Sequence, residues 1–211
     1  MTSKSVTFKS GELSLVGRVF TPEGKGPYPG VVVCHPHPQY GGSMDNNVVD
    51  SICDSLTSKS IISFKFNFRG VNGSEGKFGN GPGEEDDVRA AISFILSAKE
   101  VNPYRLGLVG YSAGSAWGLK AACGDARVKA LAALSPPLSM FDFSCLQNCT
   151  KPKLMISGTE DRLIPVEPFE SFCRSFPEPK ECITVKGADH SWQGYEADAA
   201  EMVSGFFGRM L

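Results

Sequence analysis

Neither sign of charge is in excess in this sequence, and no hydrophobic run is long. Its 211 residues include 21 Lys and Arg against 23 Asp and Glu, so the formal net charge is −2. Proteins that bind nucleic acid or anionic lipids need a basic surface that neutralises phosphates. A helix that crosses a bilayer needs about 20 consecutive apolar residues. We therefore expect no nucleic-acid partner and no membrane partner.

The N-terminus lacks the pattern of a secretory signal peptide, and the sequence lacks internal repeats. Residues 1–10 are polar and of mixed charge, without a basic segment followed by an apolar one. We therefore expect a cytoplasmic protein. A chain of 211 residues, 41% of them hydrophobic, has the size and composition of one globular domain, so we expect a single domain over residues 1–211.

Paired cysteine motifs are missing as well. The seven cysteines are an odd number, and no two of them form a Cys-x-x-Cys pair. Several lie within apolar runs, which favours buried, reduced thiols. Cys145 and Cys149 are close enough in sequence to pair or to bind a metal, but no second cysteine pair accompanies them.

The apolar residues follow first a hairpin pattern and then an alternation of strands and helices. Strands are predicted over residues 6–8 and 13–20, joined by a turn at Gly11. Further along, apolar runs of strand length alternate with segments of helical period, as in a parallel sheet covered on both faces. The further predicted strands are 31–33, 61–68, 106–109, 128–134, 154–156 and 183–185, and the predicted helices are 46–58, 84–98, 113–122, 167–176 and 196–210. This pattern predicts an α/β fold with a mostly parallel eight-stranded sheet.

One serine has the surroundings of a catalytic nucleophile. The segment Gly110-Tyr111-Ser112-Ala113-Gly114 matches the pattern Gly-x-Ser-x-Gly, directly after a predicted strand and directly before a predicted helix. Ser112 would then occupy a sharp turn, where a Cβ at Gly110 or Gly114 would collide with neighbouring backbone. The adjacent helix N-terminus favours developing negative charge. The alternative is an ordinary Gly-Ser loop, so catalytic partners are needed to decide.

Both partners occur in the chain order that accompanies this motif, which is serine, then acid, then histidine. Asp161, preferred over the adjacent Glu160, follows the strand predicted at 154–156. His190 follows the strand predicted at 183–185 and is the only histidine after Ser112. We expect His190 to take the serine proton as general base, and Asp161 to orient the imidazole and stabilise its charged form. The alternatives are a helix-capping aspartate and a surface histidine.

A tetrahedral intermediate also needs N–H donors for its oxyanion. One expected donor is the backbone N–H of Ala113, and the second comes from the loop after the third strand, which begins HPHPQY at residues 35–40. Prolines have no N–H, so we predict His37 as the donor, with Gln39 or Tyr40 as alternatives. A metal site at the two histidines of this loop is a further alternative, because imidazoles bind zinc.

Other distinctive segments extend over most of the chain. They are HPHP at residues 35–38, GGSMDNN at 41–47, NFRGV at 67–71, GSEG at 73–76 and GYSAG at 110–114. With Gly158, Asp161 and His190, they resemble small α/β-hydrolases of the dienelactone-hydrolase-like type. The resemblance implies an eight-stranded α/β-hydrolase core, a triad of Ser112, Asp161 and His190, and no metal or organic cofactor. Dienelactone hydrolases themselves use a cysteine nucleophile, whereas position 112 is serine.

The segment between the sixth and seventh predicted strands is short. Hydrolases of this fold that bind bulky lipids usually insert several lid helices here, whereas only residues 135–153 are available. One short helical turn near residues 143–146 fits, so we expect a minimal lid or none, and an open site. Met140, Phe141 and Phe143 are candidates for the acyl side of the pocket, although an aromatic cluster is more often part of the core.

Together these features predict a serine hydrolase that cleaves carboxylic esters of small acyl groups through an acyl-enzyme, in the manner of a carboxylesterase, with a small-molecule ester as its partner. A thioesterase, or an amidase or peptidase of the same fold, is the alternative enzyme. The alternative of another class is a non-catalytic binding or scaffold protein with a hydrolase fold, but an intact triad favours the enzyme. Both a monomer and a homodimer remain open.

Overall fold

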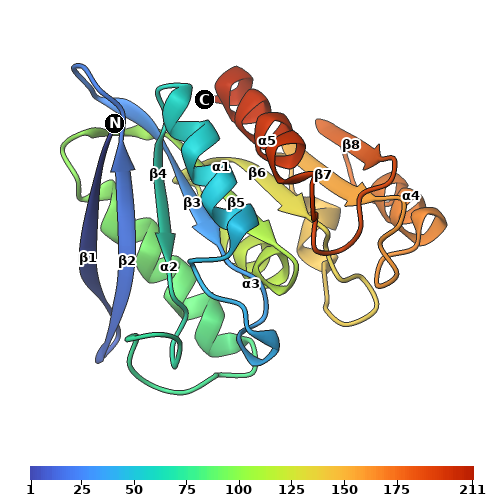
Figure 1. Ribbon diagram of the computed structural model, residues 1–211, viewed down its shortest axis with the longest axis horizontal. Helices are drawn as coiled ribbons and strands as arrows, with labels where there is room; N and C mark the ends of the chain where they lie inside the picture. Colours follow the sequence, from blue (N-terminus) through green and yellow to red (C-terminus); the bar gives the residue numbers. More distant parts are fainter.

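An eight-stranded sheet forms the centre of the protein. The computed structural model describes residues 1–211, and the strand order is β1-β2-β4-β3-β5-β6-β7-β8 (Figure 1). The strands are β1 (Thr2–Ser10), β2 (Leu13–Thr21), β3 (Tyr28–Cys34), β4 (Ile62–Phe66), β5 (Val101–Tyr111), β6 (Val128–Leu134), β7 (Lys153–Gly158) and β8 (Lys180–Val185). The predicted α/β fold with eight strands is confirmed.

Only one end of the sheet departs from a parallel arrangement. β1 pairs antiparallel with β2, and β2 pairs antiparallel with β4, whereas the remaining neighbours are parallel. The chain runs from β3 to β4 on one side and then returns past β3 to β5 on the other. Such a reversal leaves a crevice at the carboxyl ends of the strands. The loops after β3, β5, β7 and β8 therefore gather at this edge of the sheet.

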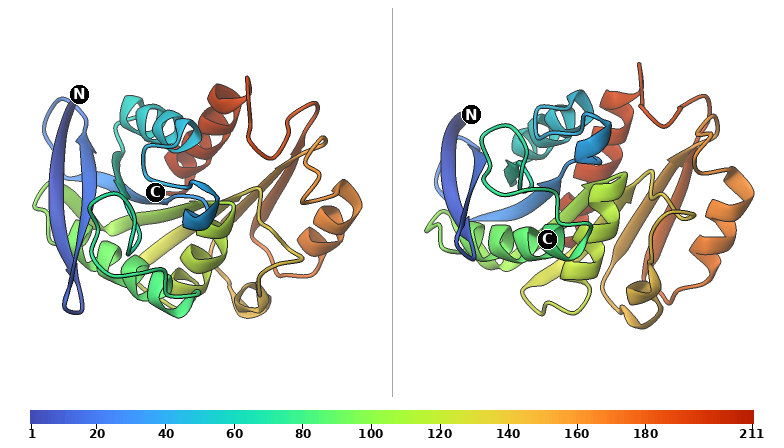
Figure 2. Two further views of the ribbon diagram at one scale, coloured as in Figure 1. Left: turned by 60° about the horizontal axis from the view of Figure 1, so that its bottom comes forward. Right: turned by 90° about the horizontal axis from the view of Figure 1, so that it is seen from below.

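Helices cover both faces of the sheet (Figure 2). They are α1 (Asn47–Ser58), α2 (Pro82–Leu96), α3 (Ala113–Ala122), α4 (Val166–Arg174) and α5 (Glu196–Met210), with 3₁₀ turns η1 (Pro38–Tyr40) and η2 (Ser144–Asn148). α1 and α5 share a core with Val31 and Val33, while α2, α3 and α4 share the other core with Val32 and Leu108. Successive strand residues point to opposite faces, and because both faces are covered the central strands are continuous apolar runs. None of the helices combines the length and the apolar character needed to cross a bilayer.

The helices agree with their predicted ranges to within about two residues, while several strands are longer than predicted. β5 differs most, because it begins at Val101 rather than at residue 106. Val101 pairs with Tyr28 before the register shifts. The residues that follow, 102–105, are partly or fully exposed, so no apolar run marks this part of the strand.

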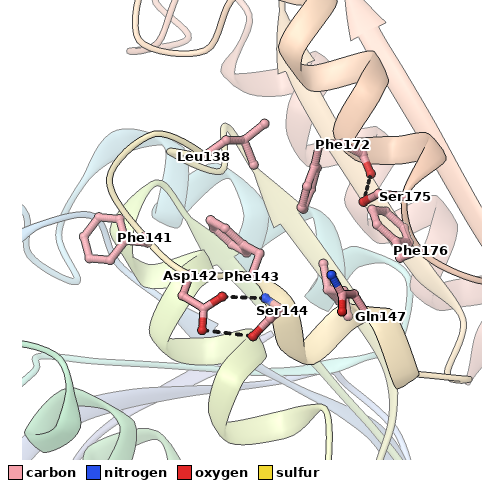
Figure 3. A pocket seen from close by; sticks show the side chains of 10 residues that line it. Leu138, Phe141, Asp142, Phe143, Ser144, Gln147, Phe172, Ser175 and Phe176 are labelled. Atoms are coloured by element: carbon pink, nitrogen blue, oxygen red, sulfur yellow. Dashed lines mark hydrogen bonds between the residues drawn. The ribbon is translucent and has the colours of Figure 1, made fainter.

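The connection from β6 to β7 contains no lid, and η2 is its only helical turn, as predicted. Phe143 in this connection is 7% exposed and packs edge-on against Phe172 of α4, with the ring centroids 5.5 Å apart. It lines a hollow between η2 and α4 (Figure 3). The expectation that Phe143 lines the acyl side of the pocket at Ser112 is therefore wrong, because its ring packs toward α4 as part of the core.

Two cysteines correct the expectation of reduced thiols. Cys173 of α4 and Cys182 of β8 form a disulfide, with their Cα atoms 6.4 Å apart. The pairing depends on how α4 packs beside β8, which the sequence spacing does not reveal. The other five cysteines are free. Cys145 does not pair with Cys149, and its Sγ lies 3.3 Å from that of Cys123.

Candidate active site

Ser112 lies at the junction of β5 and α3, as the motif predicts. Its backbone has a φ of 52° and a ψ of −127°, and a positive φ in a residue with a Cβ marks a strained turn. The Ser112 N–H donates to the carbonyl oxygen of Leu134 in β6 at 2.8 Å, and the Ser115 hydroxyl donates to the Ser112 carbonyl oxygen at 2.5 Å. These two hydrogen bonds hold the turn that projects the serine side chain from the carboxyl end of the sheet.

Two glycines allow α3 to approach the sheet closely. A Cβ at Gly110 would collide with the carbonyl oxygen of Gly114, and a Cβ at Gly114 would collide with the carbonyl oxygens of Cys34 and His35. Only glycine fits at these two positions, because the backbone segments of the turn, α3 and the end of β3 pack directly against one another. This approach brings the first turn of α3, whose N–H groups have no intrahelical acceptor, next to Ser112.

Three side chains from separate loops form one hydrogen-bonded chain. The Oγ of Ser112 lies 3.0 Å from Nε2 of His190, and Nδ1 of His190 lies 2.8 Å from Oδ2 of Asp161. The Asp161 side chain is fully buried, whereas that of His190 is 25% exposed. Oδ1 of Asp161 accepts from the N–H groups of Leu163 and Ile164 at 3.0 and 3.1 Å. These two bonds fix the carboxylate so that its other oxygen faces the imidazole.

The loop that carries His190 is anchored by two aromatic residues. The hydroxyl of Tyr111 donates to the His190 carbonyl oxygen at 2.7 Å. Trp192 is fully buried with a φ of 59°, and its Nε1–H donates to Oγ of Ser135 at 3.0 Å. Neither aromatic residue was identified from the sequence as a support for the site. The only available signal was their position beside Ser112 and His190 in the chain.

The loop after β3 leaves one backbone N–H free near Ser112. The N–H of Gln39 donates to Nδ1 of His37 at 3.2 Å, and the N–H of Tyr40 donates to the His37 carbonyl oxygen at 3.1 Å, so both alternative oxyanion donors are engaged. The N–H of His37 has no acceptor in the chain. Ala113 begins α3, where the helix offers its N–H no acceptor. Two unengaged N–H groups thus belong to residues that line one pocket with Ser112.

His35 is fully buried beneath this loop. Its Nδ1 lies 2.6 Å from the carbonyl oxygen of Pro36, and its Nε2 lies 3.1 Å from the backbone nitrogen of Phe68. Nδ1 must donate and Nε2 must accept, which fixes a neutral tautomer. Both ring nitrogens are thereby engaged, which leaves none for a metal site shared with His37. Burial lowers the pKa of His35 from its usual 6.5 to about 4.

Acidification is expected to destabilise the fold through His35. The unfolded chain takes up this proton near pH 6.5, whereas the folded protein takes it up only near pH 4, because burial lowers the pKa. The stabilisation of the folded protein by neutral His35 is therefore complete above pH 6.5, and it is lost as the pH falls toward 4. The His35 contribution to the free energy of unfolding should be about 3 kcal/mol smaller at pH 4 than at pH 7.

Urea unfolding of the wild type and of His35→Gln at both pH values measures this contribution. The glutamine amide also has a donor and an acceptor but does not titrate, so the variant should lose less stability than the wild type on acidification. Equal losses in the two proteins would contradict the assignment to His35.

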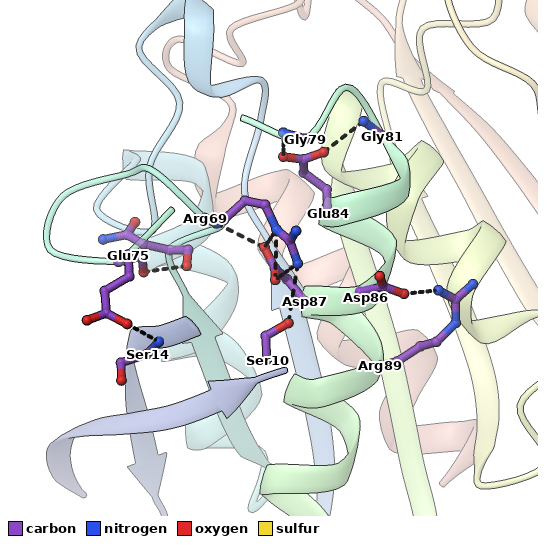
Figure 4. A network of polar contacts seen from close by, with 12 residues as sticks. Ser10, Ser14, Arg69, Glu75, Gly79, Gly81, Glu84, Asp86, Asp87 and Arg89 are labelled. Atoms are coloured by element: carbon purple, nitrogen blue, oxygen red, sulfur yellow. Dashed lines mark hydrogen bonds and ion pairs between the residues drawn. The ribbon is translucent and has the colours of Figure 1, made fainter. Parts of the chain in front are cut away.

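A buried ion pair braces the loop between β4 and α2 (Figure 4). Nη2 and Nε of Arg69 donate to the two carboxylate oxygens of Asp87 at 2.7 and 3.0 Å, and the Asp87 side chain is fully buried. Glu84 accepts from two backbone N–H groups of the same loop at 2.7 and 2.8 Å. The same loop supplies the Phe68 N–H that donates to His35. Through this hydrogen bond, the network also supports the loop after β3.

A pocket of about 550 Å³ opens at Ser112. Its walls come from the loop after β3, the β6–β7 connection and the loops that follow β7 and β8. Met140 and Phe141, which the sequence predicted for its acyl side, line this pocket. Its rim carries Tyr40, Met140 and Leu163, which are 79%, 53% and 53% exposed. The pocket is open to solvent and has an apolar rim.

Comparison with known proteins agrees with this geometry. Residues 31–203 match a family described as an alpha/beta hydrolase domain. The chain is similar to an uncharacterized protein of Rickettsia prowazekii, with 31% identity over 170 residues that cover 77% of this chain and 71% of that protein. It is also similar to a solved serine hydrolase homologue from Coxiella burnetii, with 28% identity, a TM-score of 0.89 and 97% of each chain covered. A solved serine hydrolase without a lid from Xanthomonas campestris has 27% identity and a TM-score of 0.88, covering 100% of this chain and 96% of that one. The chain therefore belongs to the α/β-hydrolase domain family.

Proposed function

We propose that the protein is a serine hydrolase that cleaves carboxylic esters of small acyl groups through an acyl-enzyme on Ser112. The observation that carries this proposal is the hydrogen-bonded chain from Ser112 through His190 to the buried Asp161, with distances of 3.0 and 2.8 Å, on the wall of an open pocket. The two similar solved proteins described above are both named as serine hydrolases or their homologues, which supports the reaction class. The dienelactone-hydrolase-like resemblance supports a triad of Ser112, Asp161 and His190, while the serine at position 112 argues against the cysteine-based chemistry of those enzymes.

In the first half of the proposed reaction, Nε2 of His190 takes the hydroxyl proton of Ser112 while Oγ attacks the ester carbonyl carbon. Asp161 accepts from Nδ1–H, which keeps the Nε2 lone pair directed at the serine and stabilises the imidazolium. The developing oxyanion accepts from the N–H groups of His37 and Ala113, and the N-terminus of α3 adds a favourable dipole. His190 then passes its proton to the alcohol oxygen, which leaves.

In the second half, a water molecule takes the place of the alcohol. His190 accepts a proton from this water as its oxygen attacks the acyl carbonyl carbon. The same two N–H groups stabilise the second oxyanion. Collapse of this intermediate breaks the bond to Oγ, His190 returns the proton to Ser112, and the carboxylic acid is released.

Hydrolysis of p-nitrophenyl esters from acetate to decanoate tests the proposed activity. We expect turnover that is highest for short acyl groups, together with covalent labelling by a fluorophosphonate. Labelling without turnover would keep the nucleophile but indicate a thioester or an amide as substrate. A folded protein that shows neither labelling nor turnover would overturn the proposal and favour a binding protein with a hydrolase fold.

A further inference from the structure

Phe141 is shared by the pocket at Ser112 and a second hollow. This hollow measures about 220 Å³ and lies between the β6–β7 connection and α4 (Figure 3). Leu138, Phe143 and Phe172 contribute apolar side chains to it. Phe141 is the only residue that lines both the hollow and the pocket. Phe141 therefore belongs to the walls of two spaces that are otherwise lined by different residues.

The ring of Phe141 is positioned by aromatic neighbours on the oxyanion side of the pocket. Its centroid lies 5.9 Å from that of Trp117, in an edge-on arrangement, and 6.4 Å from that of His37. Trp117 is almost fully buried in the core on α3. A rigid partner on one side restricts where the Phe141 ring can move. The ring is half-buried and packs on the side of the pocket where His37 lies.

The chemistry of the site determines which part of an ester meets this wall. His190 must deliver its proton to the leaving oxygen, so the alcohol part lies on the His190 side of the pocket. That side is lined by Leu163, Asp189 and Ser191. The acyl part must then occupy the rest of the pocket, whose wall includes Phe141 beside His37.

We propose that Phe141 ends the acyl-binding part of the pocket and restricts the enzyme to short acyl groups by excluding longer chains from the second hollow. This inference rests on the proposed esterase function and adds the residue that sets its chain-length limit. The hollow has polar residues in its lining as well, but Leu138, Phe143 and Phe172 give it an apolar wall. The methylenes of a longer chain would be favourably buried against this wall if the ring of Phe141 were absent. The ring of Phe141, rather than a lack of space beyond it, sets the limit on the length of the acyl chain.

Truncation of this side chain tests the inference. In Phe141→Ala, the ratio of kcat/KM for p-nitrophenyl octanoate to that for the butyrate should rise about tenfold. Each methylene removed from water contributes roughly fourfold, so this rise corresponds to burial of fewer than two of the roughly four extra methylenes. Phe141→Leu, which retains more of the packing against Trp117, should give an intermediate ratio and serves if the alanine variant folds poorly. Thermal unfolding of each variant accompanies the kinetics.

Two further variants separate the second hollow from a general loosening of the site. Phe141→Ala combined with Leu138→Trp should return the octanoate-to-butyrate ratio to the wild-type value, because the indole fills the hollow without lining the pocket at Ser112. Met140 lines that pocket but does not border the hollow, so Met140→Ala enlarges the pocket alone. It should not reproduce the tenfold rise in the ratio.

The outcomes distinguish this inference from the function on which it rests. An equal fall for all esters in Phe141→Ala, with no change in the ratio, would overturn the inference and leave Phe141 as a packing residue. A rise in the ratio that Leu138→Trp fails to reverse would also overturn it. A wild-type protein that hydrolyses no ester and takes no label would overturn the proposed function, and this inference with it.

Discussion

Replacing Ser112 with alanine is expected to lower kcat/KM for p-nitrophenyl butyrate by about 10⁵-fold. The variant lacks the oxygen that attacks the ester, so no acyl-enzyme forms, and only the oxyanion donors and the pocket remain to assist water. The Ser112 side chain makes its single hydrogen bond to His190, and the strained backbone is held by groups outside this side chain. The fold should therefore survive the substitution.

Steady-state kinetics and fluorophosphonate labelling check this result, with thermal unfolding as evidence that the variant is folded. Ser144→Ala is a matched control, because Ser144 lies in η2 and its hydroxyl bonds to the exposed Asp142 rather than to the triad. Labelling should persist in this control and vanish in Ser112→Ala. If Ser112→Ala kept labelling and more than about 1% of turnover, another group would be the nucleophile.

Asp161→Asn is expected to lower kcat/KM by about 10⁴-fold while the protein remains folded. The amide oxygen can replace Oδ1, which accepts from the N–H groups of Leu163 and Ile164. The amide NH₂ group must then face Nδ1 of His190, where the carboxylate had accepted. Nδ1 is forced to accept, so the imidazole proton moves to Nε2. An Nε2–H cannot take the proton of Ser112, and the general base is lost.

The adjacent carboxylate supplies the control for this second variant. Glu160 is exposed, and the hydrogen bonds of the His190 ring go to Ser112 and Asp161 instead. Glu160→Gln should therefore change kcat/KM by no more than about twofold. Kinetics on both variants, with circular dichroism to establish folding, decide between the two acids. A large loss in Glu160→Gln together with a small loss in Asp161→Asn would reverse the assignment of the acid.

Much of the fold was predictable because buried parallel strands are apolar runs of limited length. The ends of those runs also located Ser112, Asp161 and His190, since each of the three follows a strand. Chain order then suggested the roles that we propose for them. The sequence could not supply the distances between them, because the three residues come from loops that only the folded sheet brings together.

Features that depend on packing between elements were not predictable. The pairing of Cys173 with Cys182 requires α4 to lie beside β8. Phe143 lies in an irregular segment, which has no helical or strand period. Its position in the sequence therefore does not indicate the direction in which its ring points. The prediction of His37 as oxyanion donor rested on the prolines beside it, and only the structure shows that the N–H groups of Gln39 and Tyr40 are engaged in hydrogen bonds.

The position of His190 links the proposed activity to an edge of the sheet. His190 follows β8, which is the last strand of the sheet, has a neighbour on one side only and contains no fully buried residue. Opening of such an edge requires far less free energy than unfolding of the central strands. Detachment of β8 would carry the imidazole away from Ser112 while the rest of the sheet stays intact. Thermal inactivation would then begin before the loss of secondary structure, and the link from Cys173 to Cys182 fastens the strand whose detachment would cause it.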